Sequence, residues 1–548
     1  MVVGALFVAT CASTATRAET ANVGGVKPPI FAGLVSPGRK VTTASADAQA
    51  YFSQGLAFLY AFNHDEAARA FRQAAALDPE CAMAWWGVAI ANGPHINNPV
   101  VTEDGARAAW EALEKANRAA KASEIEKALI AALGKRYANP QPTDRKPLDE
   151  AYAAAMRALW KAHPEDADIG ALFAESMMDL RPWELWTLDR KPQPGTDEII
   201  AALETVLAKA PKHPLALHLY IHAVEASPQP EKADDEADRL RTLEPRLGHL
   251  VHMPSHIDVR RGRWQQAMRA NELAIEADRN YRKTSPEQGF YQVYMAHNHH
   301  MLAFAAMMRG QSQRAITAIN EMAQEIPAQW VKDNAELADG FTAMPLEVLV
   351  RFGRWPEVLA APEPPEYLPI ARALRHCARG IAYAAQGELE NAKAEQTAFK
   401  RHQAAVPKEA KFSNNTASDL LAVAEHLLAG EILYRDRKVD EAIAQLREAV
   451  KREDQLKYAE PPDWIIPVRH ALGATLLREG RAAEAEAVYR EDLEKLPENG
   501  WSLFGLARAL RLQQKHDEAA KLDARYAKAW ADADVKISSS CYCLPGSR

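Results

Sequence analysis

The sequence predicts an all-α protein that is built as a superhelical solenoid of antiparallel helix pairs. The chain has 548 residues, which is too long for one compact core but natural for a solenoid, because each repeat contacts only its neighbours. Hydrophobic residues make up 48% of the chain, which is enough for a continuous core. Ala, Leu, Glu, Lys and Arg are abundant and favour helix, and no convincing run of alternating strand residues is present.

Large apolar, small and aromatic residues recur in the order that a 34-residue helix–turn–helix repeat requires. Small residues are needed where the two helices of a repeat touch, and aromatic residues fill the gap beside them. The clearest unit contains Tyr51, Gly55, Phe58, Ala67, Phe71, Ala74 and Pro79. Similar units follow within residues 302–327, 380–392 and 430–519. The pattern is typical of the tetratricopeptide repeat, so the predicted fold is an all-α tetratricopeptide-repeat superhelical solenoid.

A short apolar run, residues 2–10, opens the chain and is followed by small residues. The run is too short to span a membrane and predicts a signal peptide over residues 1–21, although the usual basic segment before it is missing. We therefore expect export to the periplasm or the extracellular space, and a cytoplasmic location if this segment is not a true signal. Cys11 raises the alternative of a lipoprotein, but Thr10 is not the residue that usually precedes a lipidated cysteine. No later segment predicts a transmembrane span.

Composition divides the rest of the chain into five segments. A stretch rich in Gly, Pro, Ser and Thr is expected to be extended, and a rigid Pro-rich sequence, APEPPEYLP, separates two helical arrays. In order, the segments are a leader over 22–45, an N-terminal array with a histidine-rich groove over 46–360, the break over 361–369, a C-terminal repeat array over 370–533, and a tail over 534–548. Helices of the first array are expected within 102–137, 146–163, 166–180 and 196–210, before histidine-bearing repeats over 211–327.

Two histidine pairs recur at the interval of one repeat. His218 and His222 lie in HLYIHAVE, and His252 and His256 lie in HMPSHI, 34 residues further along the chain. Residues one repeat apart occupy equivalent places on adjacent repeats, so these four imidazoles are expected to lie close together. Pro254, between the members of the second pair, either opens a helix or kinks one.

Further histidines extend this cluster. His249 can share a face with the second pair, and the phrase AHNHHM contains a pair spaced i, i+3. His299, in the same phrase, falls at a packing position of the repeat and is expected to be structural. In this type of repeat the first helix of each unit lines the concave face, and all three histidine groups lie on predicted first helices. We therefore predict a metal site in the groove that is formed by His218, His222, His252, His256, His297 and His300.

Glu225 lies on the same helix face as His218 and His222, at i+7 and i+3. We predict Glu225 to be a catalytic acid or base, and the alternatives are a metal ligand or an acceptor for an imidazole N–H. Two histidines one turn apart can bind one transition metal, but the HExxH signature of zinc proteases is absent because Leu219 follows His218. Imidazole ligands suit a transition metal ion such as zinc, copper or iron, and they leave open whether one ion binds or two.

The charge of the chain limits its expected partners. The formal net charge is −7 and no dense basic stripe is present, so a nucleic acid is not expected as a partner. The groove of such arrays binds ligands, and we expect a peptide, a protein or a small molecule there. A packing role for the duplicated histidines is the alternative to a functional site, although several adjacent neutral imidazoles are an unusual choice for packing alone.

Several longer phrases resemble a group of bacterial tetratricopeptide-repeat proteins that carry the histidine motifs HxxxHAxE, HMPSH and HNxH. The similar phrases are GLAFLYAFNHDEAARAF, GPHINNP, MMDLRPWELW, HLYIHAVEASPQPEKA, GHLVHMPSHI, AHNHHM and EPPDWIIPVRHALGATLL. The resemblance covers most of residues 46–520, and the repeat fold does not require the histidine phrases. It implies the fold and does not supply a reaction.

Two classes of function therefore stand side by side. In the first, the histidine groove holds a transition metal that acts as a Lewis acid or a redox centre, in an oxidoreductase or a hydrolase. In the second, the protein is a non-catalytic scaffold whose groove binds a peptide or protein partner. Metal analysis of the purified protein separates these two classes best.

Overall fold

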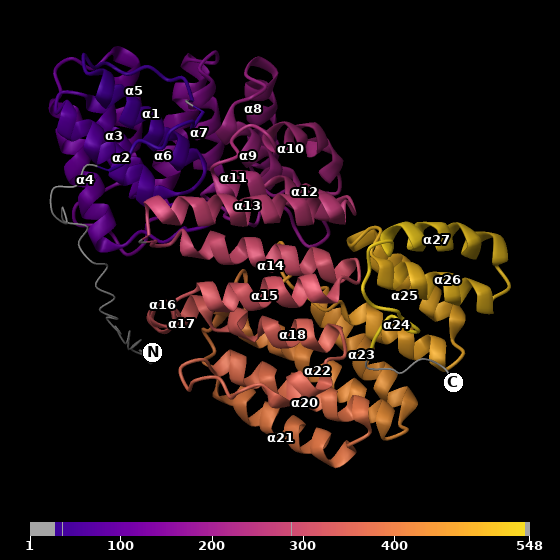
Figure 1. Cartoon of the computed structure of the whole chain (residues 1–548). Coiled ribbons are helices and arrows are strands. Elements are labelled where there is room, and N and C mark those ends of the chain that lie inside the picture. Colours follow the sequence, from indigo (N-terminus) through magenta and orange to yellow (C-terminus); the bar gives the residue numbers. More distant parts are fainter. Residues whose placement is uncertain (1–27, 36, 287, 543–548) are drawn as a thin grey trace, which may run out of the picture.

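The computed structural model describes residues 28–35, 37–286 and 288–542 (Figure 1). It confirms the predicted fold class, an all-α tetratricopeptide-repeat superhelical solenoid of antiparallel helix pairs. In the described part of the chain the strands are limited to β1 (Lys411–Phe412) and β2 (Asn415–Thr416), which form one antiparallel pair. Within the same residues, no helix is long and apolar enough to cross a membrane.

The predicted leader contains no helix over residues 28–35 and 37–45. It lies against the first helices, where the Arg39 guanidinium pairs with the Asp168 carboxylate at 3.0 Å. The predicted signal peptide, residues 1–21, lies outside the described residues.

The first eight helices form the N-terminal part of the solenoid. Side chains of Ser, Thr, Asn or Asp accept a backbone N–H at the start of five of them, which is the hydrogen bond that favours these residues as helix N-caps. The helices are α1 (Ala46–Tyr60), α2 (His64–Leu77), α3 (Ala82–Ala91), α4 (Glu103–Arg118), α5 (Glu124–Leu133), α6 (Lys146–Ala162), α7 (Ala167–Met178) and α8 (Thr196–Lys209), with a short 3-10 helix η1 (Gly134–Arg136) after α5.

The histidine-bearing repeats follow directly. Pro254 is the first residue of a helix, so the interruption that the sequence predicts falls at Met253 and divides one helical run into two short helices. The elements are α9 (Pro214–Val224), η2 (Pro230–Ala233), α10 (Asp234–Leu240), α11 (Gly248–His252), α12 (Pro254–Arg260), α13 (Trp264–Thr284), α14 (Gln292–Met308) and α15 (Ser312–Glu325).

The rest of the chain continues the solenoid after a few short helices. Residues 361–368, within the predicted Pro-rich break, carry no helix. The elements are α16 (Ala328–Asp333), α17 (Ala335–Ala338), η3 (Gly340–Ala343), α18 (Met344–Arg351), α19 (Trp355–Ala360), α20 (Pro369–Gln386), α21 (Leu389–Ala405), α22 (Ala417–Arg435), α23 (Val439–Glu453), α24 (Val468–Arg478), α25 (Ala482–Lys495), α26 (Gly500–Leu512) and α27 (His516–Ala529).

Glycines pack against aromatic rings where the helices of a repeat meet, as the sequence pattern predicts. Gly55 and Gly87 lie on either side of the Phe71 ring, and a Cβ added to either would approach that ring to 2.6 and 2.3 Å. Gly473 and Gly505 flank the Tyr489 ring in the same way. The small and aromatic residues of the repeat therefore form one interlocked contact.

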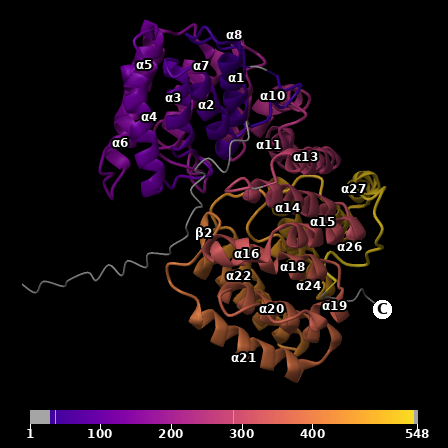
Figure 2. The ribbon, with the colours of Figure 1, turned by 60° about the vertical axis from the view of Figure 1, so that its left-hand side comes forward.

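Two hydrophobic cores run through the solenoid. The first extends from Tyr51 to Met295, and the second extends from Val259 to Ala529. The cores overlap in sequence at α12 to α14, and Figure 2 shows α13 and α14 between the indigo N-terminal helices and the orange ones. The second core continues across the helix-free residues 361–368, so this connection does not separate two cores.

The C-terminal helices pack back onto the middle of the chain. The Trp264 indole N–H donates to the Pro497 carbonyl at 2.8 Å, and the Trp501 indole N–H donates to the Met307 carbonyl at 2.7 Å. These hydrogen bonds join α13 and α14 to the first turn of α26 and to the residues just before it, about 200 residues further along the chain. The solenoid therefore makes contacts beyond those between neighbouring repeats.

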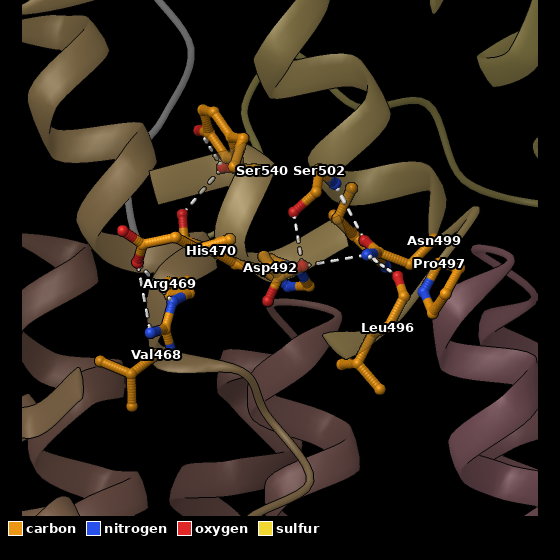
Figure 3. A network of polar contacts seen from close by, with 12 residues as sticks. Val468, Arg469, His470, Asp492, Leu496, Pro497, Asn499, Ser502 and Ser540 are labelled. Atoms are coloured by element: carbon orange, nitrogen blue, oxygen red, sulfur yellow. Dashed lines mark hydrogen bonds and ion pairs between the residues drawn. The ribbon is translucent and has the colours of Figure 1, made fainter. Parts of the chain in front are cut away.

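A buried polar network connects part of the predicted tail to the C-terminal helices (Figure 3). The Asp492 carboxylate accepts the Ser502 hydroxyl at 2.7 Å and lies 3.0 Å from the His470 imidazole. The Ser540 hydroxyl donates to the His470 carbonyl at 2.8 Å, and Ser540 is fully buried. The described part of the tail, residues 534–542, is thus packed against the helices.

Candidate metal centre

Three adjacent pieces of the solenoid carry the histidines that the sequence predicts as a site. Helix α9 supplies His218 and His222, the α11–α12 run supplies His252 and His256, and α14 supplies His297. The structure brings these five imidazoles together, because the helices pack side by side as first helices of successive repeats. The first four side chains are buried, and that of His297 is half-buried.

One set of three imidazoles lies between α9 and α11. The ligand nitrogens of His218, His222 and His249 all lie within 4.8 Å of one another. The ring centroid of His218 is 5.0 Å from that of His222 and 4.9 Å from that of His249. We call this set the first triad.

A second set of three imidazoles lies between α11, α12 and α14. The ligand nitrogens of His252, His256 and His297 also lie within 4.8 Å of one another. The Nε2 atoms of His252 and His256 approach to 2.7 Å, and the His297 ring is centred 4.7 Å from that of His252. We call this set the second triad.

Glu225 joins the two triads. The His222 Nδ1–H donates to Glu225 Oε1 at 2.8 Å, and the His256 Nδ1–H donates to Glu225 Oε2 at 2.5 Å. Burial by itself raises the pKa of the Glu225 carboxyl, but the interactions with His256 and His222 lower it to about 2. Glu225 is therefore a carboxylate with both oxygens engaged as acceptors, which is the arrangement of a residue that orients imidazoles.

Acceptors also orient the Nδ1 atoms of two further histidines. The His218 Nδ1–H donates to the Tyr60 carbonyl at 2.9 Å, at the end of α1. The His252 Nδ1–H donates to Asn271 Oδ1 at 2.7 Å, and the Asn271 amide nitrogen is already committed to the Ala267 carbonyl. Four imidazoles thus carry their proton on Nδ1, which leaves the Nε2 lone pair free on each.

In the first triad, those lone pairs meet no hydrogen-bond donor in the described residues. The Nε2 atoms of His218 and His222 are buried and make no hydrogen bond there. In the second triad, the Nε2 lone pairs of His252 and His256 point at each other over 2.7 Å. Two facing lone pairs repel unless a proton or a metal ion lies between them, so the cluster has the chemistry of a cation site.

Burial keeps most of these imidazoles neutral. Burial lowers the pKa of His218, His252 and His297 well below the usual range, and neighbouring imidazoles add to this shift. For His256, burial by itself lowers the pKa, but the Glu225 carboxylate outweighs it and raises the value. Neutral imidazole is the form that binds a metal ion.

His300 and His299 lie outside both triads. The His300 ring is centred 6.2 Å from that of His297, and neither of its ring nitrogens has a hydrogen-bond partner in the described residues. His299 faces away, toward Glu321 and Glu325 at 3.8 and 3.7 Å, where Arg279 already pairs with both carboxylates. These contacts are consistent with the structural role that the sequence predicts for His299.

Two aromatic residues with positive φ angles border the cluster. Phe62, with φ of 56°, packs against the rings of His218 and His95 at centroid distances of 4.3 and 4.6 Å. Trp183, with φ of 62°, packs edge-on against His222 at 5.3 Å. Such backbone angles are costly for aromatic residues and gather at ligand sites. At Phe62 the positive φ belongs to the turn between the two helices of a repeat, as at Gly310 and Arg437, whereas Trp183 lies outside such a turn.

A cavity of about 960 Å³ opens directly onto the cluster. Imidazoles of both triads line it, together with His300. Its other walls include residues from the segment between α23 and α24, notably Glu460, more than 200 residues beyond the first triad. Sequence reasoning did not find Glu460, because repeat periodicity relates only neighbouring repeats.

Asp278 of α13 fixes the spacing of the helices that carry the histidines. Its carboxyl accepts from the Tyr291 hydroxyl and the Asn298 amide at 3.2 and 2.7 Å, and the Tyr291 oxygen accepts the backbone N–H of His249. Gly248 approaches so closely that a Cβ there would lie 2.1 Å from the Asp278 carboxyl. Burial raises the pKa of Asp278 to about 7.

We expect this carboxyl to make the free energy of unfolding depend on pH. Because the pKa is raised in the folded state, the stabilisation is complete below about pH 4 and is lost as pH rises toward 7. Between pH 5.5 and 8.5 the loss is about 2 kcal/mol. Asp278→Asn removes this titration, so urea unfolding should show the variant gaining stability relative to the parent over that interval. An unchanged difference between the two proteins at both pH values would contradict the assignment.

Comparisons with known proteins agree with the helical-repeat architecture. The tetratricopeptide repeat model matches residues 48–81, which span α1 and α2. No curated protein matches the chain. Among solved structures, a human IFIT1 dimer with m7Gppp-AAAA is similar at 14% identity, with 90% of this chain and 92% of that chain covered and a TM-score of 0.33.

Two further solved structures are also similar to this chain. The APC/C hetero-tetramer Cut9–Hcn1 shares 13% identity, over 91% of this chain and 79% of that chain, with a TM-score of 0.33. Yeast Tom70 shares 11% identity, over 90% and 91% of the two chains, with a TM-score of 0.29. Likeness at these scores carries no argument about ligands.

Fold and site together define a class: a helical-repeat protein with buried imidazoles clustered beside a cavity. More particularly, the α1–α2 hairpin matches the tetratricopeptide repeat, and the rest of the chain repeats its helix-pair architecture.

Proposed function

We propose that this protein binds two transition-metal ions, one in each triad, and that it is a metal-dependent oxidoreductase. The observation that carries the proposal is the set of four imidazoles whose Nδ1–H groups are fixed by acceptors. The ring nitrogens of each triad lie within 4.8 Å of one another, and the Nε2 atoms of His218 and His222 have no hydrogen-bond partner in the described residues. Metal-binding histidines characteristically donate the other ring N–H to a carboxylate or carbonyl in this way.

The ligand set favours an imidazole-binding metal. Each triad offers three imidazole nitrogens, and a fourth ligand could enter from the cavity. Modest rearrangement, which includes widening the 2.7 Å separation between the Nε2 atoms of His252 and His256, would allow metal–nitrogen bonds of ~2.0–2.1 Å. Copper, iron and zinc all suit such sites. His300 lines the cavity near His297 and does not complete either triad.

The state of Glu225 favours oxidoreductase over hydrolase chemistry. A hydrolase that used Glu225 as its general base would need a carboxylate oxygen free to take a proton from the attacking water. Both Glu225 oxygens already accept imidazole protons, so Glu225 acts here as an orienting residue rather than as a free base. Neutral nitrogen ligands leave the charge of the ion uncompensated, which stabilises the lower oxidation state of a redox metal such as copper or iron.

Elemental analysis of protein expressed in medium replete with copper, iron and zinc tests the proposal. We expect about two metal equivalents per chain, and the loss of about one in His218→Ala and in His252→Ala, because each variant removes a ligand from a different triad. His426→Ala is the control, since His426 pairs with Gln445 on α22 and α23 and contacts neither triad. Metal-free parent protein, or equal loss in the control, would leave the non-catalytic scaffold as the function.

A further inference from the structure

We propose that the cavity beside the triads binds a neutral, hydroxylated aromatic small molecule of about two rings, with its hydroxyl oxygens directed at the metal positions. This inference rests on the proposed metal function and names the class of ligand that the same site takes.

The size of the cavity fits a small molecule. Its volume of about 960 Å³ is at the upper end of the range for drug-sized ligands. Its lining includes imidazoles of both triads, so a bound molecule would lie next to the proposed metal positions. A two-ring ligand would occupy only part of this volume, so its position would be set by the polar groups at the imidazole end of the cavity.

The walls favour an aromatic ligand. Trp183, Phe290, Trp330 and Phe341 line the cavity together with aliphatic side chains such as Val331. Aromatic rings pack well against one another in offset or edge-on arrangements, and flat rings fit between such walls. Trp183 holds a left-handed backbone conformation at this wall, which is typical of residues that shape ligand sites.

The polar groups of the walls favour hydroxyls. Glu460 is 6% exposed; its Oε1 accepts the Tyr458 hydroxyl at 2.8 Å, whereas its Oε2 has no hydrogen-bond partner in the described residues. Both ring nitrogens of the buried His300 also lack partners there. A ligand hydroxyl that donates to Glu460 would satisfy a buried acceptor that the protein itself leaves open.

The charges of the lining argue against a polyanion. The basic residues Arg181, Lys411 and Lys457 are matched by acidic residues, Glu184, Glu460 and Asp463. Lys457 pairs with Glu184, and burial raises the pKa of Glu460 and Asp463 to about 7, so the lining mixes basic and acidic groups and is not a purely basic pocket of the kind that binds polyanions. The ligand class that remains is neutral and aromatic, with hydroxyls at one end.

Calorimetric titration with 2,3-dihydroxynaphthalene tests this inference on the full chain, after the metal content of the same sample has been measured. We expect saturable 1:1 binding, and at least tenfold weaker binding of 2,3-dimethoxynaphthalene, which keeps the rings but cannot donate or ligate. Glu460→Gln should weaken binding of the dihydroxy compound by roughly tenfold, since the amide NH2 group can replace the unpartnered acceptor Oε2 with a donor, and leave the dimethoxy compound unchanged.

Val293→Trp provides a second variant, because Val293 lines the cavity one turn before His297 on α14. We expect it to retain the metal and to lose binding of the dihydroxy compound at least tenfold. Val100→Trp is the matched control, since Val100 is 70% exposed and is not part of the lining.

The outcomes separate the two proposals. Metal-loaded parent protein that does not bind the dihydroxy compound overturns the ligand class and leaves the metal function standing. Metal-free protein that still binds it, with binding lost in Val293→Trp, overturns the metal function and supports the ligand class. Equal binding by Val293→Trp and the parent overturns the cavity as the location.

Discussion

Glu225→Ala is expected to weaken metal binding at both triads at once, by 10- to 100-fold for each ion. No single histidine variant should match this effect, because each histidine belongs to one triad. Glu225 accepts the Nδ1–H of His222 in the first triad and of His256 in the second. Without that acceptor, both rings are free to rotate or to move their proton to Nε2, where it blocks ligation.

Glu225→Gln gives a more selective result. Its amide has one oxygen, so it can accept from only one of the two imidazoles, and its NH2 group faces the other. That second imidazole must carry its proton on Nε2 and stops being a ligand. We expect the loss of about one metal equivalent in Glu225→Gln, and the loss of both at moderate chelator concentration in Glu225→Ala.

Competition against a chromogenic chelator, combined with elemental analysis, measures both variants. The matched control is Glu395→Ala, because Glu395 accepts the Nδ1–H of His376 at 2.6 Å in the second core, away from the triads. Parent-like chelator competition in Glu225→Ala would show that the carboxylate does not orient metal ligands. Circular dichroism confirms that each variant keeps its helices.

Removal of the metal is expected to lower the melting temperature by more than about 10 °C. An ion present at 1,000 times its dissociation constant stabilises the folded state by about 4 kcal/mol, and two ions contribute about twice that. Each kcal/mol corresponds to roughly 2–4 °C for a folding unit of 150–250 residues. Removal of the metal should also destabilise the second triad directly, because the Nε2 atoms of His252 and His256 face each other at 2.7 Å.

Differential scanning calorimetry before and after dialysis against a chelator gives this shift. The double variant His222→Ala with His256→Ala serves as the control, and its melting temperature should not respond to the chelator. A parent protein whose transition is indifferent to both chelator and added copper or zinc would show that the histidines pack without a metal.

The sequence predicted the fold because the repeat pattern is local. Gly55 and Phe71, for example, sit at fixed positions within one repeat, and they meet in the structure. The proximity of His222 and His256 was predictable for the same reason, since their 34-residue separation places them on neighbouring repeats. The six-histidine ligand set remains a prediction, with His249 now a member of a triad and His300 outside both.

Other parts of the site were beyond the sequence pattern. The left-handed backbone of Trp183 depends on tertiary packing, and aromatic residues carry no local preference for it. Glu460 reaches the cavity because the C-terminal repeats pack back across the chain, and no periodicity encodes a contact over that separation. The engagement of both Glu225 oxygens likewise required the positions of two helices to be known.

The packing of α26 against α13 and α14 changes how this chain tolerates shortening. An open array can lose its last repeat and remain folded, since only one interface is exposed. Here a truncation before Pro497 would remove the hydrogen bond from Trp501 to the Met307 carbonyl. It would also expose the indole of Trp264, which lies near the middle of the sequence. Deletions from the C-terminus should therefore abolish soluble expression before they reach any histidine of the triads.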